Sequence, residues 1–110
     1  MIYLTNGFSI HMLERLNVGD FHEIRIQRIN SKKAGDLLRG NNFRSYFGHA
    51  DTARQLEKYL RCHVPMNRDL VNFERGDLLI IATVESKRKW EQGEKAGPGF
   101  KFYLIEYGRR

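Results

Sequence analysis

Apolar and polar residues alternate along some stretches of the chain and recur at helical spacing along others. The clearest alternation covers residues 21–29, where Ile24 and Ile26 fall on one face and charged or amide side chains on the other. This pattern predicts a half-buried strand. Similar but shorter apolar stretches predict further strands at residues 3–6, 43–47 and 100–107.

Two stretches have the spacing of amphipathic helices. Apolar residues three and four positions apart predict a helix over about residues 50–61. A shorter helix is predicted over residues 32–39, starting from Ser31 and closed by Gly40 in the left-handed conformation.

The second half of the chain predicts a β-hairpin. Residues 68–73 and 78–84 are strand-like, the turn-forming residues 74–77 lie between them, and the second strand is apolar enough to be buried on both faces. Residues 86–99 are polar and contain glycine, which is typical of a mobile loop. No linker divides the chain, so we expect a single domain over residues 1–110. Its fold class is α/β, a mixed sheet of about five strands with two helices.

Composition narrows the classes of function. The 110 residues include 19 Lys and Arg against 13 Asp and Glu, a net charge of +6 that favours phosphate-bearing partners. The longest apolar run, residues 78–82, is far too short to span a membrane, and no signal peptide precedes the domain, so we expect no membrane partner. The lone Cys62 excludes an internal disulfide. No histidine has a carboxylate at metal-ligand spacing, so no metal site or cofactor is expected.

The pair Gly48-His49 lies where a predicted strand meets a predicted helix. Backbone N–H groups and the positive end of the helix dipole attract a phosphate at such a junction, and Gly48 allows close approach. His49 has the chemistry of a proton donor to a leaving oxygen. The alternative is a half-buried histidine that only helps to start the helix.

Two other stretches carry suitable chemistry. Arg88 and Glu91 would let a loop close over a phosphodiester, although a solvated charged loop explains the same residues. The stretch from Asn6 to His11 offers hydrogen bonds to bases and phosphates, and Phe8 within it offers stacking or core packing. The apolar residues of this region are expected in the core; they are Phe8, Ile10, Met12 and Leu13.

These places resemble a known family, the small ring nucleases of viruses and mobile elements that act as type III anti-CRISPR proteins. Residues 3–13 look like the start of the family, and Gly48, His49 and Thr52 match its central Gly-His-x-x-Thr signature. The motif at Asn67-Arg68 and the closing strand at residues 102–104 follow in matching order. The resemblance implies a two-fold dimer that binds cyclic tetra-adenylate and cuts it without metal into linear di-adenylate with a 2′,3′-cyclic phosphate.

The resemblance also implies roles for single residues. His49 would be the general acid, Arg88 a cation over the phosphate and Glu91 the carboxylate of the lid, with Glu85 and Glu94 as alternatives because the lid is shorter than in relatives. Ligand contacts are implied or suggested at Asn6, Phe8, Ser9, His11, Gly48, Thr52, Asn67 and Arg68. His11 stands where relatives carry a small polar residue, so its role stays open.

The resulting hypothesis is an RNA-binding hydrolase that switches off type III CRISPR signalling in the cytoplasm of a prokaryotic host. Its partners would be cyclic tetra-adenylate and a second copy of the chain, with no stable DNA partner. Two alternatives remain open, a sponge that binds the ring without cutting it and a basic nucleic-acid-binding regulator. Recovery of intact ring would favour the first, and tight sequence-dependent DNA binding the second.

Overall fold

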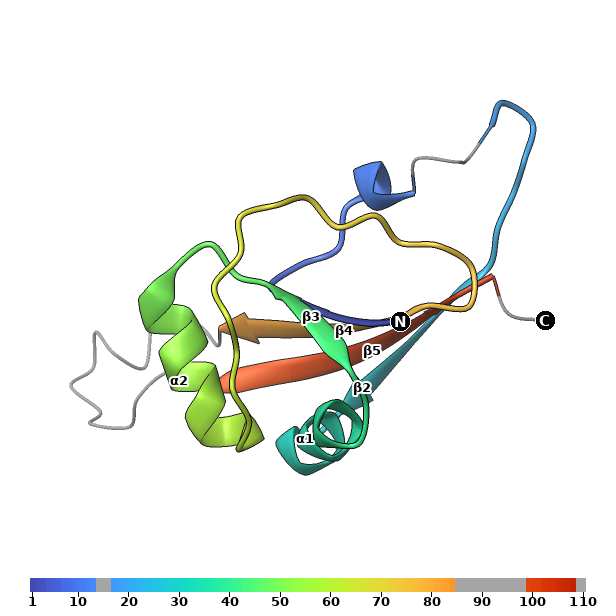
Figure 1. The fold of residues 1–110 in the computed structure, drawn as a ribbon. Helices are drawn as coiled ribbons and strands as arrows, with labels where there is room; N and C mark the ends of the chain where they lie inside the picture. Colours follow the sequence, from blue (N-terminus) through green and yellow to red (C-terminus); the bar gives the residue numbers. More distant parts are fainter. Residues whose placement is uncertain (14–16, 85–98, 109–110) are drawn as a thin grey trace, which may run out of the picture.

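The computed structural model describes residues 1–13, 17–84 and 99–108 of the chain (Figure 1). Its strands are β1 (Ile2–Thr5), β2 (Ile24–Ile29), β3 (Phe43–Tyr46), β4 (Leu78–Val84) and β5 (Phe100–Tyr107). The described helices are α1 (Ser31–Arg39), α2 (Ala50–Leu60) and the short 3-10 helix η1 (Ile10–Met12). The predicted α/β domain, with five strands and two α-helices in the described ranges, is confirmed.

The five strands form one mixed sheet in the order β2-β5-β4-β1-β3. Strand β1 is parallel to both of its neighbours, so that Thr5 lies beside Tyr46 of β3 and Ile81 of β4. Strand β5 runs antiparallel to β4 and β2. Because β1, β3 and β4 are parallel, their carboxyl ends meet at one edge of the sheet, which is where open α/β sheets place ligands.

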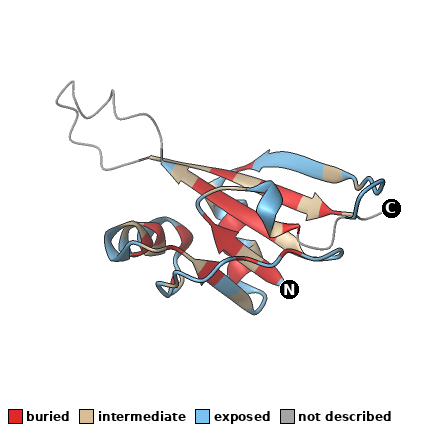
Figure 2. Ribbon diagram, turned by 90° about the horizontal axis from the view of Figure 1, so that it is seen from above, coloured by how far each residue is buried: buried red, intermediate tan, exposed pale blue. Residues whose placement is uncertain are grey.

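Each face of the sheet has its own core. On one face α1 and α2 pack side by side and bury the inward residues Leu4, Ile80, Ala82, Phe102 and Leu104. The other face is covered by the segments around residues 8–13, which include η1, and 71–73 rather than by α-helices (Figure 1). Figure 2 shows that the buried residues concentrate in the middle strands of the sheet. The alternation along β5 therefore divides its side chains between two apolar layers.

The predicted first strand of the hairpin, residues 68–73, is wrong. This segment pairs with no strand among the described residues, although Val71 and Phe73 are buried. Its backbone is tied instead to η1, since Phe73 N–H donates to the Met12 carbonyl at 2.9 Å. An extended segment that covers a sheet face buries every second residue as a strand does, which explains the misleading alternation. The predicted turn at residues 74–77 is present, closed by a hydrogen bond from Asp77 N–H to the Glu74 carbonyl.

Strand β2 differs from its prediction in length and burial. It begins at Ile24 rather than at residue 21, and the Ile26 side chain is 66% exposed. The half-buried alternation fails because β2 is an edge strand whose residues 25–28 are all exposed. Ile10 is also exposed, at 60%, although the sequence placed it in the core.

The helix ends show a second correction. Helix α1 begins at Ser31 with Asn30 as its N-cap, whose side chain accepts a hydrogen bond from Lys33 N–H. Gly40 ends α1 with φ −82°, so it is not the predicted left-handed residue. The left-handed cap occurs at Arg61, with φ 55°, after α2. Both helices are short, and no helix in the described ranges is long and apolar enough to cross a membrane.

Candidate functional site

The carboxyl end of β1 opens into a tight turn. Thr5 fixes this turn, because its Oγ1 donates to the Gly7 carbonyl at 2.6 Å and accepts from Gly7 N–H at 3.1 Å. Asn6, at the tip of the turn, is exposed, and its side chain forms no hydrogen bond with the described residues. The strand and turn therefore present the Asn6 amide to solvent at the edge where parallel strands end.

The carboxyl end of β3 leads directly into α2. His49 is the N-cap of α2 in extended backbone conformation, with φ −124° and ψ 121°, and its side chain makes no capping hydrogen bond with the described residues. Its exposed imidazole has no hydrogen-bond or ion-pair partner among the described residues. Thr52, in the same first turn, is half-buried. An imidazole thus stands beside the N–H groups at the start of a helix, as an anion site requires.

A segment after α2 returns to the free edge of β3 (Figure 1). Met66 forms a parallel bridge with Phe47, and Asn67 N–H donates to the Phe47 carbonyl at 2.9 Å. The buried Ser45 hydroxyl donates to the Pro65 carbonyl and fixes the same segment one step earlier. These contacts place Asn67 and the residue after it beside the start of α2.

Arg68 completes this arrangement. Its Nε donates to the Gly48 carbonyl at 3.2 Å, so an arginine and a histidine flank the same glycine. Among the described residues, a Cβ atom at position 48 would meet only Arg68 Cγ, at 3.5 Å, so this part of the chain leaves room for close approach to Gly48. Arg68 takes part in no ion pair within the described ranges, so its charge is available to a ligand. The Asn67 side chain instead accepts a hydrogen bond from Asp69 N–H.

The other predicted ligand contacts lie on the segment after β1. Ser9 is the N-cap of η1 and accepts from His11 N–H at 3.3 Å, and both residues are exposed. Phe8 is half-buried and packs against the core on the helix-free face. The predicted lid residues are not part of this description, because Glu85, Arg88, Glu91 and Glu94 lie outside the described residues.

The structure therefore brings together Asn6, Gly48, His49, Thr52, Asn67 and Arg68 at one edge of the sheet. Histidine, arginine and amide groups can donate hydrogen bonds to a phosphodiester. The histidine can also transfer a proton to it. No three His, Cys, Asp or Glu side chains of the described residues lie close enough together to hold a metal ion.

Two positioning residues escaped the sequence analysis. Thr5 and Ser45 are buried polar residues, 2% and 4% exposed, in β1 and β3. The available signal was a hydroxyl side chain within a predicted strand, since a hydroxyl that becomes buried there needs a hydrogen-bond partner. Thr5 shapes the turn that carries Asn6, and Ser45 fixes the segment that carries Arg68.

Comparison with known proteins identifies the family to which the chain belongs. A sequence model of the STIV B116-like family matches residues 2–95, so the chain belongs to that family. A relative from Sulfolobus islandicus filamentous virus (isolate Iceland/Hveragerdi), "Uncharacterized protein 26", is 28% identical over 94 residues, which cover 86% of this chain and 75% of the relative.

A solved structure shares the fold. B116 of Sulfolobus turreted icosahedral virus superimposes with a TM-score of 0.68 at 21% identity, covering 96% of this chain and 97% of that one. The chain is thus a member of a family of archaeal-virus proteins with this small mixed-sheet fold.

Proposed function

We propose that the protein is a ring nuclease that cleaves cyclic tetra-adenylate without a metal ion and so acts as an anti-CRISPR protein against type III signalling. The observation that carries the proposal is the pairing of His49 and Arg68 around Gly48. The imidazole has no partner among the described residues and lies at a helix N-terminus, and the guanidinium is tied to the same backbone. A general acid and a cation on either side of one glycine suit phosphodiester cleavage.

The proposed reaction uses the ribose of the substrate as nucleophile. The 2′-oxygen attacks the adjacent phosphorus, a 2′-O–P bond forms and the P–5′-O bond breaks. His49, as imidazolium, gives its proton to the departing 5′-oxygen, and a lid carboxylate, Glu91 by resemblance, accepts the 2′ proton. The products are linear di-adenylates with 2′,3′-cyclic phosphates. Asn6 and Arg68 would hold the ring so that attack and departure lie in line.

A two-fold dimer suits this substrate. In an isologous pair each residue appears twice, which matches a ring of four identical nucleotides cut at two positions. We therefore propose that the active form is a homodimer in the cytoplasm of the infected prokaryotic cell.

The test is chromatography of cyclic tetra-adenylate after incubation with the protein in EDTA, beside two histidine variants. His49→Ala removes the acid, and a lost contribution of about 10²–10⁴-fold in rate is expected. His63→Ala is the matched control, because His63 lies near the other end of α2, is 81% exposed and pairs with Glu57. Wild type and His63→Ala should yield linear di-adenylate at similar rates.

The outcomes separate the alternatives. Equal turnover by His49→Ala would refute the assignment of the acid. An intact ring with every variant, together with saturable binding of the ring, would replace the nuclease by a sponge. An intact ring without binding would overturn the proposal altogether.

A further inference from the structure

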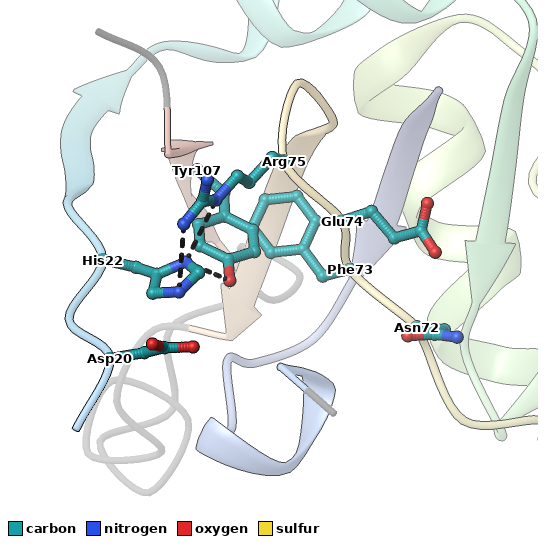
Figure 3. Close-up of a pocket in the computed structure, with 7 residues that line it drawn as sticks. All are labelled: Asp20, His22, Asn72, Phe73, Glu74, Arg75 and Tyr107. Carbon is teal, nitrogen blue, oxygen red and sulfur yellow. Dashed lines mark hydrogen bonds between the residues drawn. The ribbon is translucent and has the colours of Figure 1, made fainter. Parts of the chain in front are cut away.

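A hollow lies at the opposite end of the strands from His49, where β5 ends and β1 and β4 begin. Figure 3 shows the residues that line it. Its volume is about 320 Å³, and its lining includes Asp20, His22, Phe73, Arg75 and Tyr107. The residues come from three separate segments, the loop before β2, the turn before β4 and the end of β5. None of them belongs to the site proposed for ring cleavage.

Arg75 is held in a fixed position although it is exposed. Its Nε donates to His22 Nδ1 at 3.2 Å, and a second guanidinium nitrogen lies 3.1 Å from His22 Nε2. The stem of Arg75 packs against Gly108, where an added Cβ would lie 2.7 Å from Arg75 Cγ. Gly108 also has φ +61°, so glycine is required there on two grounds. The fold thus pre-organises a guanidinium at the mouth of the hollow.

One edge of this guanidinium is not used in the contact with His22. Within the described residues Arg75 forms no ion pair, so its remaining N–H groups are free to donate to paired acceptors. Asp20 lies on the other side of His22 from Arg75, whereas the Glu74 carboxylate is directed away from this cluster (Figure 3). One hollow therefore offers a fork of donors and a carboxylate acceptor.

The inner wall of the hollow is aromatic. The rings of Phe73 and Tyr107 are 5.3 Å apart at 34°, and those of His22 and Tyr107 are 5.4 Å apart at 35°. Tyr107 Oη lies 2.7 Å from His22 Nδ1, which fixes the imidazole. Ligand sites commonly run from roughly 300 to 1,000 Å³, so this hollow is at the small end and suits one flat ring system.

The charges select the kind of ring. A phosphate would meet the guanidinium but also the carboxylate of Asp20, which repels it. A neutral heterocycle with adjacent acceptors and adjacent donors satisfies both groups. Guanine has this arrangement, since O6 and N7 accept the two N–H groups of an arginine fork, and its N1–H and N2–H groups can donate to a carboxylate. Adenine places an amino donor beside N7 and would oppose the fork.

We propose that this hollow is a second nucleotide site, which binds the guanine base of a guanosine nucleotide, free or in single-stranded RNA. Arg75 reads O6 and N7, Asp20 accepts from N1 and N2, and His22 and Tyr107 support the ring. The proposal is independent of ring cleavage.

The test is titration of the protein with guanosine monophosphate. Binding is monitored by the NMR signals of the His22 and Tyr107 rings. Adenosine monophosphate is the competing probe, and the single-stranded RNAs UUUG and UUUU distinguish a free nucleotide from one in RNA. Arg75→Lys keeps the charge but loses the fork, and Gly108→Ala displaces the arginine. Arg54→Ala, an exposed arginine on α2, is the matched control.

We expect saturable shifts of both rings with guanosine monophosphate, at least about tenfold weaker binding of the adenosine nucleotide, and a loss of about tenfold in Arg75→Lys. Tighter binding of UUUG than of the mononucleotide, but not of UUUU, would assign the site to RNA, and equal binding would assign it to free nucleotide. Absence of saturable shifts, equal affinity for both mononucleotides, or unchanged affinity in Arg75→Lys would overturn the proposal. If Gly108→Ala does not fold, Arg75→Lys still decides, because it changes only an exposed side chain.

Discussion

Replacing Ser45 with alanine tests how the candidate site is assembled. Ser45 is 4% exposed in β3, and its hydroxyl donates to the Pro65 carbonyl. That hydrogen bond joins the sheet to the segment that carries Arg68, three residues further on. The variant should therefore lower both the free energy of unfolding and the affinity for the proposed ligand, cyclic tetra-adenylate, although Ser45 is not one of the proposed ligand contacts.

The loss of stability in Ser45→Ala depends on whether the Pro65 carbonyl finds another hydrogen-bond partner. A hydrogen bond of this kind contributes about 0.5–1.5 kcal/mol net. Pro65 is exposed, so its carbonyl can bind water once the hydroxyl is gone, and the cost stays near 1 kcal/mol. For a domain of this size that loss corresponds to roughly 4 °C in Tm. The neighbouring hydrogen bond from Asn67 N–H to the Phe47 carbonyl limits the displacement.

The assay is urea unfolding of the wild type, Ser45→Ala and Thr83→Val, with cyclic tetra-adenylate affinity measured on the same samples. Thr83→Val is the control, because Thr83 Oγ1 lies 3.5 Å from the Lys101 carbonyl, at the outer limit of a hydrogen bond, and its loss should have little effect. A Ser45→Ala protein as stable as Thr83→Val would refute the reasoning. Lower stability with unchanged ring affinity would show that the segment keeps its place without this hydroxyl.

Three further predictions concern stability. Hydrogen bonds lower the pKa of Glu57 below its ordinary value of 4.5, the larger contribution coming from the N–H of Val64 and the smaller from the ring of His63. The carboxylate therefore stabilises the fold above pH 4.5, and this stabilisation is lost as the pH falls through the lowered pKa. Glu57→Gln should therefore be less stable than wild type at neutral pH, and thermal unfolding should show the difference shrinking below about pH 4; a constant difference would contradict this. Leu56→Ala empties a fully buried position on α2 and should cost about 2–5 kcal/mol in urea unfolding, against under about 0.5 for the exposed Arg54→Ala; similar losses would contradict the packing argument. Asn30→Ala removes the N-cap of α1 and should cost about 1 kcal/mol by the same measurement, whereas no loss would show that the cap is dispensable.

The elements that the sequence predicted well are those whose pattern has one structural explanation. Ala53, Leu56 and Leu60 recur at helical spacing and are all buried on α2. The run in β4 is buried because both faces of the middle strands are covered. Where a pattern has two explanations the prediction failed. Val71 and Phe73 alternate as a strand would, yet they cover a sheet face without pairing.

The candidate site was only partly predictable, for a physical reason. The Gly48-His49 junction is local, because a strand that ends and a helix that begins are both visible in the sequence. The contact between Gly48 and Arg68 is not local, since it depends on a parallel bridge between Phe47 and Met66 that forms only after α2 has packed. No residue pattern encodes that register, and in the sequence only the family resemblance joined the two motifs. Local patterns thus give the candidate proton donor, and tertiary packing places an arginine beside it. Variants that loosen the packing should weaken the site while leaving His49 intact.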